Sequence, residues 1–159
     1  IVALLSPVCL DLAAAQTSAN ISSAGFVFPL LAPDISSRFG NRKHPISRSA
    51  RHHEGIDLSV PTGTHVRSVT AGVVIFAGSY GGYGKLVSVQ HPGGYSSIYG
   101  HLSEILVNPG QSVAVGQIIG RVGSTGISTG PHLHFEWRKN GKTIDPLRAF
   151  PALAAESQG

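Results

Sequence analysis

The sequence predicts an all-β domain built as a compact, mostly antiparallel barrel or sandwich. Apolar residues occur in short runs or alternate with polar residues, which is the pattern of strands that cover a core. The 159 residues include 20 glycines and 10 prolines, which are frequent in tight turns and uncommon in helical bundles. No segment shows the apolar spacing of an amphipathic helix over about eleven residues.

Six segments carry the strand pattern, and turns rich in glycine and proline separate them. The predicted strands are residues 72–77, 86–90, 95–99, 112–115, 117–122 and 132–138. The turns between them contain Gly81-Gly82, Pro92-Gly93-Gly94, Pro109-Gly110 and the glycine-rich stretch 123–130. Because such short connections join antiparallel neighbours, we expect an antiparallel sheet.

The chain divides into an apolar start, a linker, one folded domain and a short tail. Residues 1–15 are mostly apolar and end in Ala13-Ala14-Ala15, which predicts the remnant of a secretory signal peptide. A poorly packed N-terminus is the alternative. We assign residues 16–33 to a linker, 34–150 to the folded domain and 151–159 to a tail, although core-like apolar residues begin near residue 26. The signal predicts export to the periplasm or cell envelope.

Charge and cysteine content narrow the functional classes. A formal net charge of +4 favours docking on a polyanion such as cell wall, but no basic cluster interleaves with aromatic residues, so we expect no nucleic-acid partner. No apolar run reaches the roughly 18 residues that a membrane span needs. Cys9 is the only cysteine, which excludes a disulfide framework and a cysteine-rich zinc site. A metal site would have to use His, Asp, Glu or water.

The segment 132–138 alternates between apolar and polar side chains. One face of the expected strand carries Leu133, Phe135 and Trp137 and should pack on a core. The other face carries His132, His134, Glu136 and Arg138. The two imidazoles would lie about 6.6 Å apart along the strand, so one could ligate a metal while the other addresses a metal-bound water or the substrate. An exposed strand with outward polar residues is the alternative.

A second cluster, His52 to Asp57, places a histidine four residues before an aspartate. A helix would bring His53 and Asp57 onto one face, but Gly55 and the following Val60-Pro61-Thr62-Gly63 argue against a helix. A straight strand would separate them by about 13 Å, too far for a common ion with bonds of about 2 Å. If the pair binds a metal, the chain must bend between them, and Gly55 can permit that bend.

Two glutamates lie near these histidines. Glu136 could accept a hydrogen bond from an imidazole on its own strand face, or it could form a surface salt bridge with Arg138. Glu54 follows His53, but an H-E-x-x-H metalloprotease motif needs a helix and a second histidine where Asp57 stands. We therefore reject that motif.

The remaining histidines carry weaker signals. His101 lies in Tyr99-Gly100-His101-Leu102, at the predicted end of a strand, where a lone histidine is more often structural or exposed than catalytic. The same structural or exposed interpretation applies to His44, His52, His65 and His91. Spacing alone therefore leaves the role of His101 open.

Three separated motifs nevertheless occur in a specific order. The H-x-G-x-D of His53 to Asp57, the Y-x-H-L around His101 and the H-L-H-F of His132 to Phe135 resemble those of the lysostaphin/LytM-type zinc endopeptidases, which cut peptidoglycan. The likeness extends through Ser37-Arg38-Phe39-Gly40, the stretch 108–126 and Asp145-Pro146, and covers about residues 34–150.

The resemblance implies a zinc site and two catalytic histidines. His53, Asp57 and His134 correspond to the metal ligands, and His101 and His132 to catalytic histidines that do not bind the metal. Such a ligand set leaves zinc an open position for the water that attacks the peptide bond. One of the two catalytic histidines would orient or deprotonate this water while the other stabilises the oxyanion. The family fold is a compact antiparallel β domain of the duplicated-hybrid-motif type, with a groove over the metal.

The function implied is a zinc-dependent endopeptidase that hydrolyses peptide cross-links of bacterial peptidoglycan. The domain would act as a monomer without a membrane span, on stem or bridge peptides. The alternative is a catalytically silent LytM-type module that binds cell wall or activates an amidase, but such relatives lack ligands, and all five polar positions are present here. The sequence leaves open whether the bond cleaved joins D-Ala to diaminopimelate or lies in a glycine bridge.

A carrier or phosphotransfer domain is a further alternative, because paired glycine-rich hairpins also occur in biotinyl-like, lipoyl-like and sugar-phosphotransferase barrels. A carrier needs a lysine at the tip of its hairpin, and no lysine occurs between Asn108 and Gly126. A phosphotransfer site would not need Asp57 close to His53. We therefore favour the peptidase.

Overall fold

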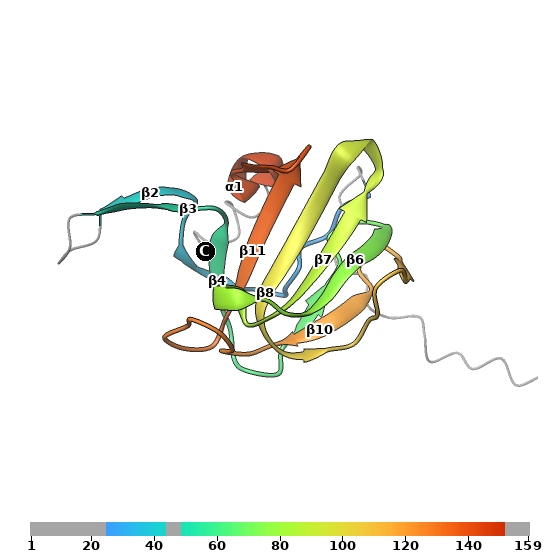
Figure 1. The fold of residues 1–159 in the computed structure, drawn as a ribbon, viewed down its shortest axis with the longest axis horizontal. Coiled ribbons are helices and arrows are strands. Elements are labelled where there is room, and N and C mark those ends of the chain that lie inside the picture. Colours follow the sequence, from blue (N-terminus) through green and yellow to red (C-terminus); the bar gives the residue numbers. More distant parts are fainter. Residues whose placement is uncertain (1–24, 44–48, 152–159) are drawn as a thin grey trace, which may run out of the picture.

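The computed structural model describes residues 25–43 and 49–151 and confirms an antiparallel β fold with almost no helix (Figure 1). The strands are β1 (Asp34–Ser37), β2 (Gly40–Lys43), β3 (Ala50–His53), β4 (Ile56–Ser59), β5 (His65–Arg67), β6 (Gly72–Ser79), β7 (Lys85–His91), β8 (Tyr95–Ile105), β9 (Ser112–Val113), β10 (Ile118–Val122), β11 (His132–Lys139) and β12 (Lys142–Ile144). Short helical turns are η2 (Gly81–Tyr83), η3 (Pro92–Gly94) and α1 (Pro146–Ala149).

The main sheet has the strand order β1-β4-β11-β8-β7-β6-β9, and every pair of neighbours in it is antiparallel. β12 pairs with the end of β11, while β10 pairs with both β8 and β5. β2 and β3 form a separate two-stranded ribbon that extends away from the main sheet (Figure 1). β4 and β11 therefore lie inside the sheet, next to the point where the ribbon leaves it.

Each of the six predicted strands corresponds to an observed strand, and the largest difference is in β8. The prediction ends this strand at residue 99, whereas β8 continues to Ile105. Its first part, up to Gly100, pairs with β11, and its last part, from Leu102, pairs with β10. His101 lies between the two parts with a φ of 60°, a left-handed conformation that is uncommon for a residue other than glycine. The predicted end of the strand is thus the point where β8 changes its partner from β11 to β10. Bulge-like distortions at such points redirect side chains.

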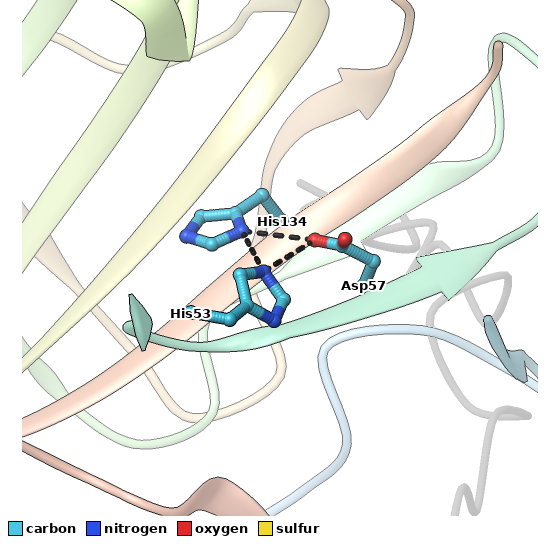
Figure 2. A group of neighbouring side chains, drawn as sticks. All are labelled: His53, Asp57 and His134. Carbon is cyan, nitrogen blue, oxygen red and sulfur yellow. Dashed lines mark hydrogen bonds and ion pairs between the residues drawn. The ribbon is translucent and has the colours of Figure 1, made fainter. Parts of the chain in front are cut away.

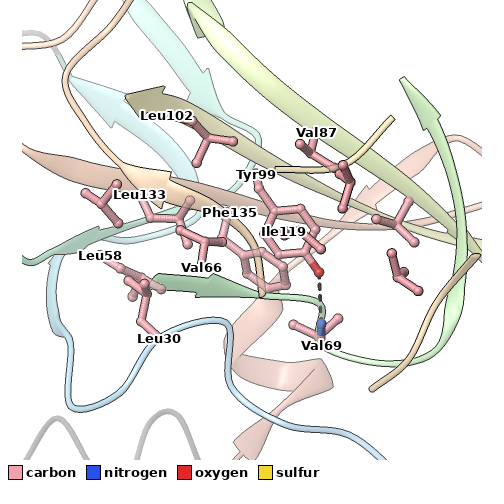
Figure 3. Packing of buried hydrophobic residues seen from close by; sticks show 14 of the residues in the cluster. Leu30, Leu58, Val66, Val69, Val87, Tyr99, Leu102, Ile119, Leu133 and Phe135 are labelled. Atoms are coloured by element: carbon pink, nitrogen blue, oxygen red, sulfur yellow. Dashed lines mark hydrogen bonds between the residues drawn. The ribbon is translucent and has the colours of Figure 1, made fainter. Parts of the chain in front are cut away.

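The core packs between the central strands and the segments β5 and β10 (Figure 3). Leu133, Phe135 and Trp137 of β11 are all buried, so the alternation predicted for this strand is correct. The phenol of Tyr99 is fully buried as well, and its oxygen accepts a hydrogen bond from the backbone N–H of Val69 at 3.0 Å. Packing on one face of β11 therefore fixes the direction of the polar side chains on its other face.

Packed residues begin before Asp34. Val27 and Leu30 belong to the buried hydrophobic residues, and the ring of Phe26 meets Trp137 edge-on with centroids 6.0 Å apart. Residues 25–33, which we assigned to the linker, therefore pack against the domain, because their apolar side chains cover part of its core.

Several sequence predictions concern residues outside the described ranges. They are the signal-peptide remnant 1–15, linker residues 16–24, His44 and tail residues 152–159. Within the described ranges, no helix is long and apolar enough to cross a bilayer.

Neither a helix nor a straight strand connects His53 to Asp57. β3 ends at His53 and pairs with β2, whereas β4 begins at Ile56 and pairs with β1 and β11. Gly55 lies between the two strands, and a Cβ at this position would be 2.2 Å from the carbonyl oxygen of Phe135. Only glycine lets the chain approach β11 this closely.

We expect Gly55→Ala to lower the free energy of unfolding by about 1–3 kcal/mol, because the added methyl group pushes β4 away from β11. Denaturant unfolding measures the change. Gly130→Ala is the matched control, since its Cβ would meet no atom within 4 Å. Equal stability of the two variants would contradict the close approach.

Candidate functional site

Three side chains from separate strands meet where the ribbon joins the main sheet. Asp57 on β4 and His134 on β11 are opposite each other in the antiparallel register, and His53 ends β3. Nε2 of His53 lies 3.1 Å from Oδ1 of Asp57 and 3.2 Å from Nδ1 of His134 (Figure 2). Nδ1 of His134 is in turn 2.9 Å from Oδ1 of Asp57. The bend required between His53 and Asp57 is therefore present.

This donor set fits a tetrahedral metal ion. The three ligand atoms are 2.9–3.2 Å apart. Two ligands of a tetrahedral zinc ion with bonds of about 2.0 Å would be separated by about 3.3 Å, so only small adjustments are needed. Two imidazole nitrogens and one carboxylate oxygen are also ligand types that zinc accepts. His53, Asp57 and His134 could therefore hold zinc together.

The second nitrogen of each ligand histidine is hydrogen-bonded to an oxygen. Nδ1 of His53 lies 2.9 Å from the carbonyl oxygen of Arg38, and Nε2 of His134 lies 3.0 Å from Oε1 of Glu136. Both oxygens are acceptors, so these nitrogens carry the proton of the neutral rings. The other nitrogens then direct their lone pairs towards the shared space beside Asp57, as metal ligands must.

Glu136 is a buried acceptor behind His134. Its side chain is 0% exposed, and Oε1 also accepts a hydrogen bond of 2.7 Å from the hydroxyl of Tyr83. Oε2 accepts from the guanidinium of Arg138, whose Nη2 atom also lies 3.3 Å from Oε2 of Glu54. Glu136 thus has both of the partners that the sequence suggested, an imidazole and Arg138. Its ion pair with Arg138 is not a surface salt bridge, because the side chain of Glu136 is buried. Burial raises the pKa of Glu136, yet the hydrogen bonds from His134 and Tyr83 and the charge of Arg138 outweigh burial and lower it.

Asp57 and His134 stabilise each other's charged forms when no cation is between them. Burial raises the pKa of Asp57, but hydrogen bonds with His134 and His53 outweigh it and hold this pKa far below its usual range. Burial lowers the pKa of His134, but Asp57 and Glu136 outweigh that effect and raise it to about 9. A metal ion that binds to Nδ1 of His134 would therefore have to compete with a proton for this nitrogen.

His101 and His132 lie beside the three-residue cluster. Nε2 of His132 is 3.8 Å from Oδ1 of Asp57, and the rings of His101 and His132 have centroids 4.7 Å apart. Nδ1 of His101 donates to the carbonyl oxygen of Thr125, and Nδ1 of His132 donates to that of Gly130, both at 2.8 Å. Each neutral ring therefore keeps Nε2 free of hydrogen and able to accept a proton. Burial lowers the pKa of His101, which favours its neutral form.

Two glycines bring the carbonyl group of Thr125 to His101. Gly84 after η2 and Gly126 in the loop 123–130 pack backbone against backbone, and a Cβ on Gly126 would lie 2.3 Å from the nitrogen of Gly84. Both residues have positive φ angles, 64° and 74°, which glycine adopts at little cost. The loop between β10 and β11 is thereby fixed against the turn before β7.

All five predicted site residues line one groove. The groove also contains Arg42 and Arg51 from the ribbon and Tyr83 and Ile127 from two turns. Tyr83 was not among the predicted site residues, because nothing in Gly81-Gly82-Tyr83 distinguishes it from an ordinary turn residue. The two arginines could have been found from the hairpin pairing of the strands that precede His53.

The other described histidines lie apart from the metal-ligand cluster. His91 is buried, with Nδ1 2.8 Å from the carbonyl oxygen of Ala71 and Nε2 2.8 Å from the hydroxyl of Ser97. His52 bonds to the side chain of Asn41 at 3.0 Å, and His65 is exposed on β5. Their environments are those of structural or surface histidines.

Comparison with known proteins gives the same family from three directions. Residues 51–146 match the model of Peptidase family M23. The chain is 49% identical over 119 residues to the DD-carboxypeptidase/endopeptidase Mpg of Neisseria meningitidis, covering 75% of this chain and 27% of the relative. It is 41% identical over 122 residues to the peptidoglycan DD-endopeptidase ShyA of Vibrio cholerae, covering 76% of this chain and 28% of that relative. A crystal structure described as a zinc-containing peptidase from Vibrio cholerae superposes with a TM-score of 0.71 and 38% identity, covering 74% of this chain and 37% of that one.

The chain spans about a quarter of the length of the curated relatives it matches. The range matched by the family model contains the three residues that could hold a metal and both neighbouring histidines. The chain belongs to peptidase family M23.

Proposed function

We propose that this domain is a zinc-dependent endopeptidase that hydrolyses peptide cross-links of bacterial peptidoglycan. One observation carries the proposal: three side chains with convergent lone pairs lie beside two further histidines whose Nε2 atoms are free to take up protons. A metal site with a structural role would not need the second pair. The names of the relatives Mpg and ShyA support an endopeptidase, and that of ShyA supports peptidoglycan as substrate.

The five residues divide into two groups with different tasks. His53, Asp57 and His134 would hold zinc. The hydrogen bonds that the two imidazoles donate to the carbonyl oxygen of Arg38 and to Glu136 would keep both rings in the ligand orientation. A bound zinc supplies a Lewis acid that polarises the scissile carbonyl group and lowers the pKa of water.

His101 and His132 would move the protons. The neutral rings accept at Nε2, so one of them can take a proton from the attacking water. The resulting imidazolium can donate to the leaving amine or stabilise negative charge on the carbonyl oxygen. Nε2 of His132 lies 3.8 Å from Oδ1 of Asp57, and this short distance to a proposed metal ligand supports a role for His132 in the proton transfers.

We also infer that the domain acts in the cell envelope and works as a monomer. Peptidoglycan lies in the envelope, and relatives of this chain include proteins described as lipoproteins. The alternative of a catalytically silent module that binds cell wall or activates an amidase is disfavoured by the complete ligand set. Zinc content and hydrolysis of purified sacculi together distinguish the two functions.

His134→Ala should abolish both zinc retention and hydrolysis, because it removes a ligand from the centre of the donor set. Zinc is measured in the dialysed protein, and hydrolysis by weighing the fragments released from sacculi. His65→Ala is the control, since His65 is exposed on β5. A variant that kept a full equivalent of zinc would show that the metal is bound elsewhere.

His101→Ala should keep its zinc and lose turnover by about 10²- to 10⁴-fold, the usual contribution of a general acid or base. The same two measurements apply, with His65→Ala again as control. If the variant digested sacculi at the wild-type rate, the role assigned to His101 would be wrong.

Glu136→Gln should weaken zinc binding by about 10- to 100-fold, because an uncharged acceptor makes His134 a poorer ligand. Competition with a chelator measures the dissociation constant, and thermal unfolding checks that the variant is folded. Glu104→Gln is the matched control, since Glu104 is half exposed and pairs with Arg121. Equal zinc affinities in the two variants would remove Glu136 from the metal site.

A further inference from the structure

The β2–β3 ribbon carries two arginines on the same face as His53. In its antiparallel register, Gly40 is opposite His53 and Arg42 is opposite Arg51. Side chains alternate along a strand, so Arg51 points to the same side as His53, and Arg42 lies beside Arg51 on that side. The pair is about 7 Å further along the ribbon than His53. Both arginines line the groove that contains the proposed metal ligands.

These two guanidinium groups are poorly neutralised. Like charges opposite each other on neighbouring strands destabilise the pairing. The guanidinium of Arg42 has one ion pair, 3.3 Å from Oδ2 of Asp57, and the side chain of Arg51 makes no hydrogen bond or ion pair with any residue that the structure describes. Arg138, which also borders the site, is by contrast bound by Glu136 and Glu54. The ribbon side of the groove therefore has positive charge without matching protein carboxylates.

We propose that Arg42 and Arg51 form a subsite for a carboxylate of the substrate, next to the bond that is cut. This inference rests on the proposed endopeptidase function and specifies its substrate class. A guanidinium presents paired N–H donors that match the two oxygens of a carboxylate, and such charge-assisted bonds are stronger than neutral ones. A substrate carboxylate would also relieve the repulsion between the two arginines.

The two types of cross-link between which the sequence does not decide differ in whether a free carboxylate lies next to the bond that is cut. In a D-Ala–diaminopimelate link, the carbon that bears the acylated nitrogen also bears a free carboxylate. In the interior of a glycine bridge, the corresponding carbon bears only the next peptide carbonyl. The subsite therefore selects the diaminopimelate type of cross-link, or another cross-link with an acidic residue on the amine side.

The position of Arg42 agrees with this placement. Its Nη2 atom lies 3.3 Å from an oxygen of Asp57, so the guanidinium reaches the edge of the metal-ligand cluster. In the diaminopimelate link, the free carboxylate is three covalent bonds from the scissile carbonyl carbon. A carbonyl group held at the cluster would thus bring the carboxylate within reach of the ribbon, with Arg51 beside Arg42.

The experiment compares two synthetic cross-linked peptides that differ only at this carboxylate. One contains D-Ala joined to diaminopimelate with the carboxylate free, and the other has it converted to a carboxamide. Binding to the zinc-loaded His101→Ala protein is measured by calorimetry, and KM and kcat are measured with the active protein. Arg51→Gln and Arg42→Gln are introduced into both backgrounds, and Arg67→Gln on β5 is the matched control.

We expect the free carboxylate to bind at least about tenfold more tightly than the carboxamide, as one charge-assisted contact would provide. Arg51→Gln should remove this preference and raise KM for the free carboxylate, with kcat and zinc content nearly unchanged. Arg42→Gln should also remove the preference and raise KM for the free carboxylate. The zinc content of this variant is measured as a control, because Arg42 contacts Asp57. Arg67→Gln should keep the preference.

Equal binding of the two peptides, absence of binding, or a preference that survives both arginine substitutions would overturn the subsite. These outcomes are separable from failure of the proposed function. Hydrolysis of both peptides at equal KM leaves the endopeptidase intact and removes the subsite. A preference that depends on the arginines, in a wild-type protein that cuts neither peptide, keeps the subsite and removes the endopeptidase.

Discussion

The pairing register of β4 with β11 is the constraint on which the site depends. It sets Asp57 opposite His134. Since side chains alternate along both strands, a slip of one residue would turn one of the two away from the groove. Leu58 and Leu133, buried on the core side of the same two strands, oppose such a slip. The hydrophobic core therefore holds the polar cluster in place, although no side chain of the core is itself a proposed metal ligand.

A second feature of the site is that backbone carbonyl groups orient three of the four histidines predicted for it. The carbonyl oxygens of Arg38, Thr125 and Gly130 accept from His53, His101 and His132. These carbonyls lie in turns and loops that the strands hold in place, so the proton positions are set by the fold and not by further ionisable groups. The fourth histidine, His134, depends on a buried carboxylate that is itself fixed by a phenol and a guanidinium. Among these four histidines, only His134 thus has a charged group as the partner of its second ring nitrogen.

The sequence predicted the fold class and six of the twelve strands that the structure describes, because their signals are local. Alternation in 132–138 placed Phe135 in the core, and the order of three motifs led to the family. The prediction failed where local signals were ambiguous. Gly100 and His101 suggested the end of a strand, whereas β8 continues by exchanging β11 for β10. Apolar residues before Asp34 were assigned to a linker because a short unpatterned segment gives no indication of what it covers.

The sequence by itself determined which side chains were available and required a bend between His53 and Asp57. Only the tertiary structure decided that Gly55 makes the bend against the backbone of β11, that Tyr83 reaches Glu136, and that Arg42 lies beside the cluster. The physical reason is that composition and periodicity report on neighbours within a strand. Distances across the groove depend on which strands pair, and on contacts between residues as far apart as 53 and 134.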